Sequence, residues 1–259
     1  MEKKLIFLAF ILSITVTSLL PAGAAKRPAD DESSESIGSS GIAKKAKVAA
    51  SSLALHHADG NPACIDPRLA IHYAAASGNL DALKALLLTE QRDRVNNHPG
   101  GVPPFGTAKP LHLAARNNHP AIIEELLQVP TIKVNKSDIN ENTPLHEAAK
   151  HGHPDCVKAL LKADNIEIDS INVYGHTALH DAINTGRIDV VQLLLEAGAN
   201  VDISQEVEGG RRHKSSPLQW AKWLAERAEA GYSYYKEIKK GCYSEIYRLL
   251  IRHKESKLA

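Results

Sequence analysis

A repeat of 34 residues is the strongest constraint on what this 259-residue chain can fold into. The stretch from Asn142 to Ala163 reads NTPLHEAAKHGHPDCVKALLKA, and its His146 recurs 34 positions away on either side, as His112 and His180. In each copy a short apolar run follows this histidine, then a turn, then a second run with apolar residues at helical spacing. The repeat therefore predicts pairs of short helices. Because neither helix can bury its apolar face alone, the pairs must stack on one another.

The residues of the central copy favour this helix pair locally. Thr143 can cap the first helix, and Pro144 can occupy its first turn, where the missing N–H costs nothing. Gly152 supplies a turn that tolerates positive φ. Val157 and Leu160 then lie at helical spacing in the second helix.

The Thr-Pro-Leu-His opening and the 34-residue period resemble the ankyrin repeat. The resemblance covers about residues 66 to 253 and implies an all-α fold, an ankyrin-repeat solenoid of stacked helix–turn–helix units with β-hairpin loops. Within a domain at residues 63–255, it places repeats near residues 66–104, 105–139, 140–173, 174–206 and 213–253. The first and last copies are degenerate, as expected when each end of a stack faces water.

The N-terminus reads as an export signal. A basic start at Lys3 and Lys4 precedes an apolar run that ends at Leu20, and Ala22-Gly23-Ala24 is a small-residue cleavage site. We therefore predict a signal peptide over residues 1–24, cleaved between Ala24 and Ala25. The apolar run is shorter than the ~20 residues that a membrane helix needs, which disfavours the alternative of an uncleaved anchor. The mature chain is expected to be secreted or periplasmic, without stable membrane insertion.

Residues 25–62 have the composition of a disordered linker, with no aromatic residue before Pro62 and no sustained periodicity. Two basic clusters within it, Lys26-Arg27 and Lys44 to Lys47, resemble a bipartite nuclear-import signal. The other interpretation is a solvated charged linker. Import into a host nucleus is relevant only if the protein is delivered into a eukaryotic cell.

Charge and motifs exclude several function classes. The formal net charge is +1, and the predicted signal peptide itself carries +1, so the mature chain is nearly neutral, which disfavours nucleic-acid binding. The chain has no phosphate-binding glycine loop, no G-x-S-x-G elbow and no C-x-x-C pair. Its three cysteines, Cys64, Cys156 and Cys242, cannot form a closed disulfide framework. No enzymatic activity, cofactor or small-molecule substrate is expected.

Histidines are the residues that leave a different interpretation open. The run from His146 to His151 superficially resembles a zinc-protease helix, but that motif needs its histidines four apart, and these are five apart. The ankyrin resemblance implies that the motif histidines, including His72, His112 and His180, bond backbone groups between neighbouring hairpins. A metal-dependent enzyme that uses scattered histidines is the alternative from another class.

Stacked ankyrin repeats present a concave surface, lined by the hairpin tips and by the exposed positions of each first helix. The positions expected to face outward on each first helix are those one, four and five residues after the motif histidine. The hairpin tips are expected at the residue just before each Thr-Pro/Ala-Leu-His motif. The candidate partner-binding residues chosen in this way are Leu113, Arg116, Asn117, Asn142, Glu147, Lys150, His151, His176, Asp181 and Asn184. The expected function is an exported protein–protein interaction module for a protein partner, a candidate secreted effector that acts on a host. The alternative within this class is an envelope-resident protein that binds or protects another exported protein.

Aromatic residues gather near the C-terminus. Five of the seven tyrosines lie in the last 30 residues, and Trp220 and Trp223 are spaced to share one helix face. Tyr and Trp are common at binding hot spots and equally suited to closing the end of a stack. We favour the capping role and keep the binding role open.

Overall fold

The computed structural model describes residues 69–97, 100, 106–203, 215–230 and 241–258. All of them belong to one compact unit, Ile37–Ala259. The predicted signal peptide and linker lie outside the described residues, as do residues 98–99, 101–105, 204–214 and 231–240. Within the described ranges, no helix has both the length and the apolar composition needed to cross a membrane.

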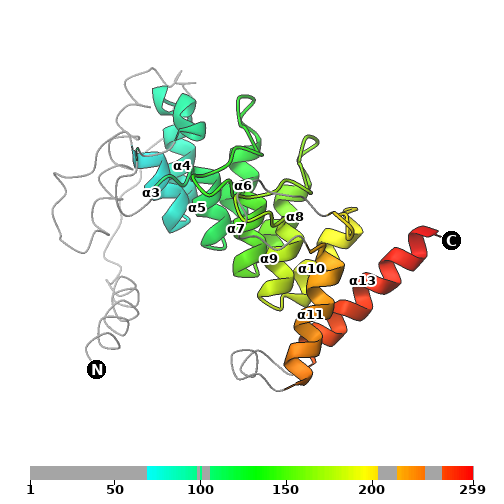
Figure 1. Ribbon diagram of the computed structural model, residues 1–259. Helices are drawn as coiled ribbons and strands as arrows, with labels where there is room; N and C mark the ends of the chain where they lie inside the picture. The colour runs from blue at the N-terminus through cyan, green and yellow to red at the C-terminus, as the bar shows by residue number, and fades with distance from the viewer. Residues whose placement is uncertain (1–68, 98–99, 101–105, 204–214, 231–240, 259) are drawn as a thin grey trace, which may run out of the picture. The chain divides into compact units, whose positions relative to one another are not determined.

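The described helices form two rows (Figure 1). Successive first helices of the repeats contact one another in one row: α3 (Ala70–Ser77), α5 (Pro110–Arg116), α7 (Pro144–His151), α9 (Ala178–Asn184) and α11 (Pro217–Glu229). Successive second helices form the other row: α4 (Leu80–Leu87), α6 (Pro120–Leu127), α8 (Pro154–Leu161), α10 (Ile188–Glu196) and α13 (Cys242–Leu258). A 3-10 helix, η3 (Glu90–Asn96), follows α4. Stacked helix pairs confirm the all-α expectation.

Proline and capping residues set the helix starts. Pro144 is the first residue of α7 and Thr143 its N-cap, as the sequence predicts. Thr177 and Ser216 form capping boxes at the starts of α9 and α11. Between the helices of a pair the chain turns through positive φ, at Gly152 in the third repeat and at Asn118 in the second.

The core lies between the two rows. Leucines at equivalent positions of α5, α7 and α9, which are Leu111, Leu145 and Leu179, are at most 2% exposed. Alanines such as Ala114 and Ala148 are fully buried, and their small size lets neighbouring first helices approach closely. Cys156 of α8 is also fully buried, and burial raises the pKa of its thiol to about 11, so it packs as a small apolar residue.

Aromatic residues close the C-terminal end of the stack. Tyr243 of α13 is 1% exposed, and its hydroxyl donates a hydrogen bond to the Asn184 carbonyl at 3.1 Å. Trp220 is buried in α11, and its ring stacks on Trp223 with centroids 4.9 Å apart. Arg227 lies over the Trp223 ring at 4.5 Å. These contacts support the capping role for Trp220 and Tyr243; the tyrosines at 232, 234 and 235 lie outside the described residues.

The two hairpin loops that the structure describes, at residues 138–142 and 172–176, are single tight turns, and no strand is assigned within the described residues. In one loop the Asp138 N–H donates to the Asn142 carbonyl at 2.9 Å; in the next the Asn172 N–H donates to the His176 carbonyl at 2.9 Å. The side chains of Asp138 and Asn172 each accept two further backbone N–H groups from their own loop. Both loops are therefore self-bonded turns of the Asx type.

Replacing Thr177 with valine should destabilise the domain by about 1–2 kcal/mol. The Thr177 side chain is fully buried, and its oxygen accepts from the His180 N–H and bonds the His180 ring. Valine keeps the shape and removes both bonds. Urea denaturation measures the change, and Thr185→Val, at a partly exposed position, is the matched control with a smaller expected cost. Equal stability of both variants would contradict this role.

Candidate binding surface

The motif histidines tie each repeat to the next loop. In each case the Nε2 atom lies at hydrogen-bond distance from a carbonyl oxygen of the loop that follows: His72 to Asn97 at 3.0 Å, His112 to Asn142 at 2.9 Å, His146 to His176 at 3.0 Å and His180 to Ser215 at 3.1 Å. In His146 and His180 the other ring nitrogen accepts from the backbone N–H of the preceding threonine. Nε2 therefore carries the proton and donates, and both ring nitrogens are occupied. These histidines have the structural role that the repeat family implies.

Burial keeps three of the motif imidazoles neutral. It lowers the pKa of His112 and of His180 to about 4, and it lowers the pKa of His146. His112 differs from His146 and His180 because Lys109 stands where they have threonine, and its Nδ1 is buried without a hydrogen-bond partner among the described residues. The buried Lys109 ammonium instead donates to the Ser137 carbonyl.

A second set of histidines also connects repeats, and sequence reasoning missed it. His119 and His153 precede the second helices α6 and α8, and their Nε2 atoms bond the Ala76 and Arg116 carbonyls of the preceding repeat at 3.2 and 3.0 Å. The signal was present, because the two histidines are themselves 34 residues apart. Arg187 follows after another 34, and a Cβ placed on Gly152 would meet its side chain. Glycine is therefore favoured at position 152 for two reasons: its φ is positive, and the Arg187 side chain occupies the space that a Cβ would need.

Four of the sequence-predicted binding residues are not outward-facing. Leu113, Glu147 and Asp181 occupy equivalent positions, directly after the motif histidine, and are only 3%, 3% and 8% exposed. The expectation of exposure is wrong for them because this position faces the neighbouring first helix. Asn142 is also buried, since its carbonyl accepts from His112 and its side chain bonds the Asn172 side chain at 2.9 Å.

The remaining predicted residues do reach solvent. Asn117, Lys150, His151 and Asn184 are exposed, and Arg116 and His176 are partly exposed. We call these six residues the first-helix strip: Arg116, Asn117, Lys150, His151, His176 and Asn184. Most of them lie near the C-terminal ends of α5, α7 and α9, so the stacking of the repeats places their positions in a row.

The buried Glu147 carboxylate anchors one part of this strip. Its Oε2 accepts from Arg116 Nε at 2.8 Å and lies 3.7 Å from His151 Nε2, while the Asn142 amide approaches Oε1 at 3.4 Å. Burial alone would raise the pKa of Glu147, but the hydrogen bond and charge of Arg116 outweigh it, so the pKa is lower than usual. Glu147 is therefore an ionised structural carboxylate, and it holds the Arg116 side chain of the preceding repeat in position.

Asp181 has a similar arrangement one repeat later. Its Oδ1 lies 3.5 Å from His176 Nδ1, and the His176 ring stacks on His180 with centroids 5.5 Å apart. His176 also lies 6.2 Å from the Trp220 ring. The strip thus continues into the aromatic contacts of the end cap.

The sequence matches a family model described as ankyrin repeats in three copies, over residues 42–138 and 111–205. The chain belongs to the ankyrin-repeat family. No curated protein matches it significantly. Among solved structures it is similar to the ankyrin repeat domain of Bcl-3, described as a unique member of the IkappaB protein family, with 28% identity, a TM-score of 0.55 and coverage of 71% of each chain. Ankyrin-repeat domains are typically protein–protein interaction modules and are generally not enzymes.

The tips of the ankyrin hairpins lie earlier in the chain than expected. Asn142 and His176, which were expected to be tips, form the bases of their loops. Each tip carries one large apolar side chain that is exposed to solvent: Ile139 is 73% exposed and Tyr174 is 52% exposed. Sequence reasoning missed both, although the turn-forming residues Asp138 and Asn172 mark them. The two loops are joined, because the Val173 N–H donates to the Asn140 carbonyl at 3.0 Å.

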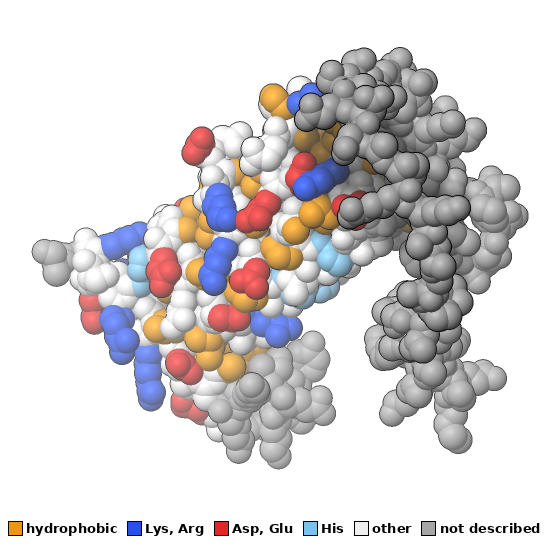
Figure 2. Space-filling model, turned by 180° about the vertical axis from the view of Figure 1, so that it is seen from behind, with side chains coloured by type: hydrophobic (Ala, Val, Ile, Leu, Met, Phe, Trp, Pro, Cys, Tyr) orange, Lys and Arg blue, Asp and Glu red, His pale blue; other side chains and the backbone are white. Residues whose placement is uncertain are grey.

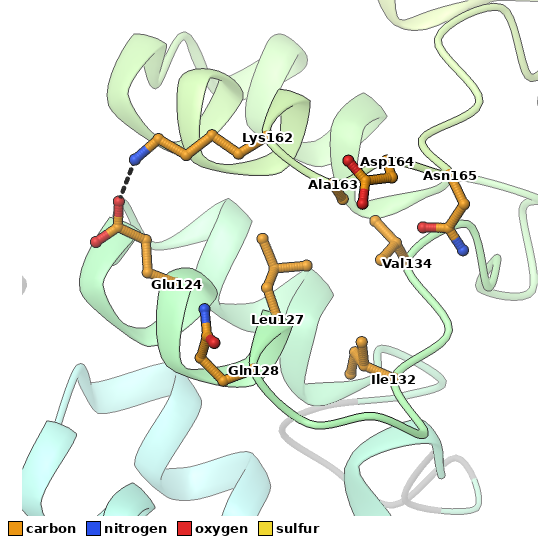
Figure 3. Close-up of a pocket in the computed structure, with 9 residues that line it drawn as sticks. All are labelled: Glu124, Leu127, Gln128, Ile132, Val134, Lys162, Ala163, Asp164 and Asn165. Atoms are coloured by element: carbon orange, nitrogen blue, oxygen red, sulfur yellow. Dashed lines mark hydrogen bonds and ion pairs between the residues drawn. The ribbon is translucent and has the colours of Figure 1, made fainter.

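A shallow groove of about 560 Å³ lies on the other row of ankyrin helices, between α6 and α8 (Figure 3). Its lining residues are Glu124, Leu127, Gln128, Ile132, Val134, Lys162, Ala163, Asp164 and Asn165. The Lys162 ammonium closes one end by pairing with Glu124 at 2.6 Å. Figure 2 shows the molecule from behind, with basic and acidic side chains interleaved on its surface. Lys84 also pairs with Glu125 of the next repeat, as Lys162 pairs with Glu124.

Metal-ligand geometry is not found within the described ranges. No group of three or more His, Cys, Asp or Glu side chains there is placed to hold a metal ion. His151 and His153 stack with ring centroids 6.1 Å apart, but His153 Nε2 is bonded to the Arg116 carbonyl.

Replacing Arg116 with alanine should lower stability by about 2 kcal/mol, because the buried Glu147 carboxylate would lose its cation and its strongest hydrogen bond. The double variant Arg116→Ala/Glu147→Gln should recover part of this loss, since the glutamine carries no charge. Urea denaturation of both single variants and the double variant forms a complete cycle. Strictly additive effects would show that the pair is not coupled.

Proposed function

We propose that this ankyrin-repeat chain is an exported protein-binding module that contacts its partner through the first-helix strip and the two hairpin tips at Ile139 and Tyr174. One observation carries the proposal. Equivalent buried positions keep the same residue, as at Leu111, Leu145 and Leu179, whereas equivalent exposed positions change, as at Arg116, Lys150 and Asn184. A packing constraint explains the repeated leucines. The varied row of donors and amides beside them is suited to recognising one particular partner.

Export is supported by the N-terminal sequence. We propose that residues 1–24 are a cleaved signal peptide, that residues 25–62 link it to the repeat domain at 63–255, and that the mature chain is secreted or periplasmic. An export signal joined to an interaction module common in eukaryotes favours a secreted effector that acts on a host protein. The basic clusters of the linker would then offer a route to the host nucleus.

The location of the mature chain tests the export part. The native cells express the chain with a C-terminal tag, the fractions are separated, and the N-terminus of the recovered protein is sequenced. A chain that begins near Ala25 outside the cell or inside a host supports the effector. The same chain retained in the envelope supports instead a resident protein that binds another exported protein. A chain that begins at Met1 and sediments with membranes overturns cleavage.

Site-specific photocrosslinking tests the binding part. A photoreactive amino acid replaces Asn184 in the first-helix strip, and the matched control replaces Gln192, which is exposed on the second-helix row. The strip is supported if a defined protein crosslinks from position 184 and not from position 192. Crosslinks from position 192 alone would place the binding surface on the opposite row.

A further inference from the structure

Charged groups are divided unequally between the first and the second helices of the first four repeats. The first helices α3, α5, α7 and α9 contain only two acidic residues, Glu147 and Asp181, and both are buried. Their cations reach solvent, since Lys150 is exposed and the Arg116 side chain is 37% exposed. The second helices α4, α6, α8 and α10 instead display exposed acids: Asp81, Glu124, Asp155, Asp189 and Glu196.

Both carboxylates of the first helices are already engaged inside the stack. Glu147 accepts from Arg116 and Asn142, and Asp181 lies against His176. Arg116 reaches Glu147 through Nε, and its terminal Nη groups bond none of the described residues. The Lys150 ammonium likewise forms neither an ion pair nor a hydrogen bond with a residue that the structure describes. The exposed charged groups of this surface are therefore hydrogen-bond donors.

Helix stability does not account for these cations. Basic residues near a helix C-terminus are favoured by the helix dipole, and Arg116 and Lys150 lie in the last turns of α5 and α7. The equivalent ends of α3 and α9 carry no basic residue, and end at Ser77 and Asn184. The stack therefore forms without a cation at this position. The Nε atom of Arg116 is needed by the buried Glu147 carboxylate, but no such role accounts for the Nη groups of Arg116 or for the Lys150 ammonium.

We infer that the surface around Arg116, Lys150 and His151 binds an acidic segment of a protein partner. Two carboxylate oxygens of the partner pair with the two Nη groups of Arg116, whose orientation is held from behind by Glu147. A neighbouring carboxylate pairs with Lys150. The inference rests on the proposed protein-binding function and adds the chemistry of the partner. The net charge of +1 favours a short acidic segment over a nucleic acid, which would need a wider basic surface.

A peptide of ten glutamates, titrated into the purified full chain at low ionic strength, tests the inference. Lys150→Glu is the informative variant, because Lys150 forms no hydrogen bond or ion pair with a described residue and acts on the stack only through its charge, which helps to lower the pKa of Glu147. Lys158→Glu makes the same change of charge on α8, where Lys158 is exposed beside Asp155. Lys150→Glu should weaken peptide binding about fivefold more than Lys158→Glu does, the effect of one surface ion pair. Thermal unfolding of both variants confirms that each remains folded.

Four results would overturn the inference. Equal weakening by the two variants would mean that the peptide responds only to net charge. Unchanged binding in Lys150→Glu would place the peptide elsewhere. Equal or tighter binding of a ten-nucleotide single-stranded DNA through Lys150 would indicate a nucleic acid as the ligand. If a protein crosslinks at position 184 but binds Lys150→Glu normally, the proposed function stands and the acidic partner is excluded.

Discussion

Replacing Leu160 with aspartate should unfold the repeat stack. Leu160 lies in α8, the central second helix, and none of its surface is exposed. The substitution removes a buried leucine side chain, at about 2–5 kcal/mol, and places a carboxylate among apolar neighbours without a counter-charge, at about 3–5 kcal/mol more. Because domains of this kind are stable by only about 5–15 kcal/mol, most of the margin is lost. Far-UV circular dichroism with urea denaturation measures it.

Lys150→Ala is the matched control for this prediction. It truncates an exposed side chain on the neighbouring helix α7 and should change stability by less than about 0.5 kcal/mol. A Leu160→Asp variant with a cooperative transition near that of Lys150→Ala would show that the two helix rows are not held together by this core.

Acid should destabilise the domain between about pH 6.5 and pH 4. Burial lowers the pKa of His112 and His180 to about 4, so the folded state holds fewer protons than the unfolded chain as pH falls below 6.5. The stability that the neutral imidazoles contribute is complete above pH 6.5 and is lost as pH falls towards 4. At about 1.4 kcal/mol per pKa unit, each histidine contributes about 3 kcal/mol.

Urea denaturation at half-unit pH intervals measures this dependence. The His112→Gln variant should show a shallower decline over the same window, because one of the buried histidines with a lowered pKa is gone. His151→Gln removes a histidine whose side chain is 41% exposed and should leave the decline nearly unchanged. Glu147, whose pKa is lowered, loses its contribution only at more acidic pH, below its ordinary range. A flat profile from pH 6.5 to 4.5 would contradict the prediction.

The helix pairs and their stacking could be predicted because their causes are local and periodic. Thr143, Pro144 and Gly152 act within their own turn, and the 34-residue period shows where the same turns recur. The burial of Glu147 and Asp181 could not be predicted in the same way. A charged residue on a helix of seven or eight residues suggests exposure, and its burial depends on partners in other segments.

Those partners explain where sequence reasoning failed at the binding surface. Arg116, which pairs with Glu147, lies 31 residues earlier in the chain. The position after the motif histidine is apolar in the second repeat, as Leu113, and aromatic in the first and fifth, as Tyr73 and Trp220. These residues were the sequence indication that the whole series faces a neighbouring helix. The tips were expected at Asn142 and His176. The side chains that form the turns, Asp138 and Asn172, lie four residues earlier, so the tips fall at Ile139 and Tyr174 instead.

The histidine bonds between repeats have a mechanical consequence. Each one joins a repeat only to its immediate neighbour, with partners about 30 residues apart, as from His112 to Asn142 and from His146 to His176. No described histidine bond bridges more distant repeats to share a load applied at the chain ends. A stack pulled from its ends would therefore yield in steps rather than all at once. Each lost repeat of 34 residues would release about 120 Å of extended chain.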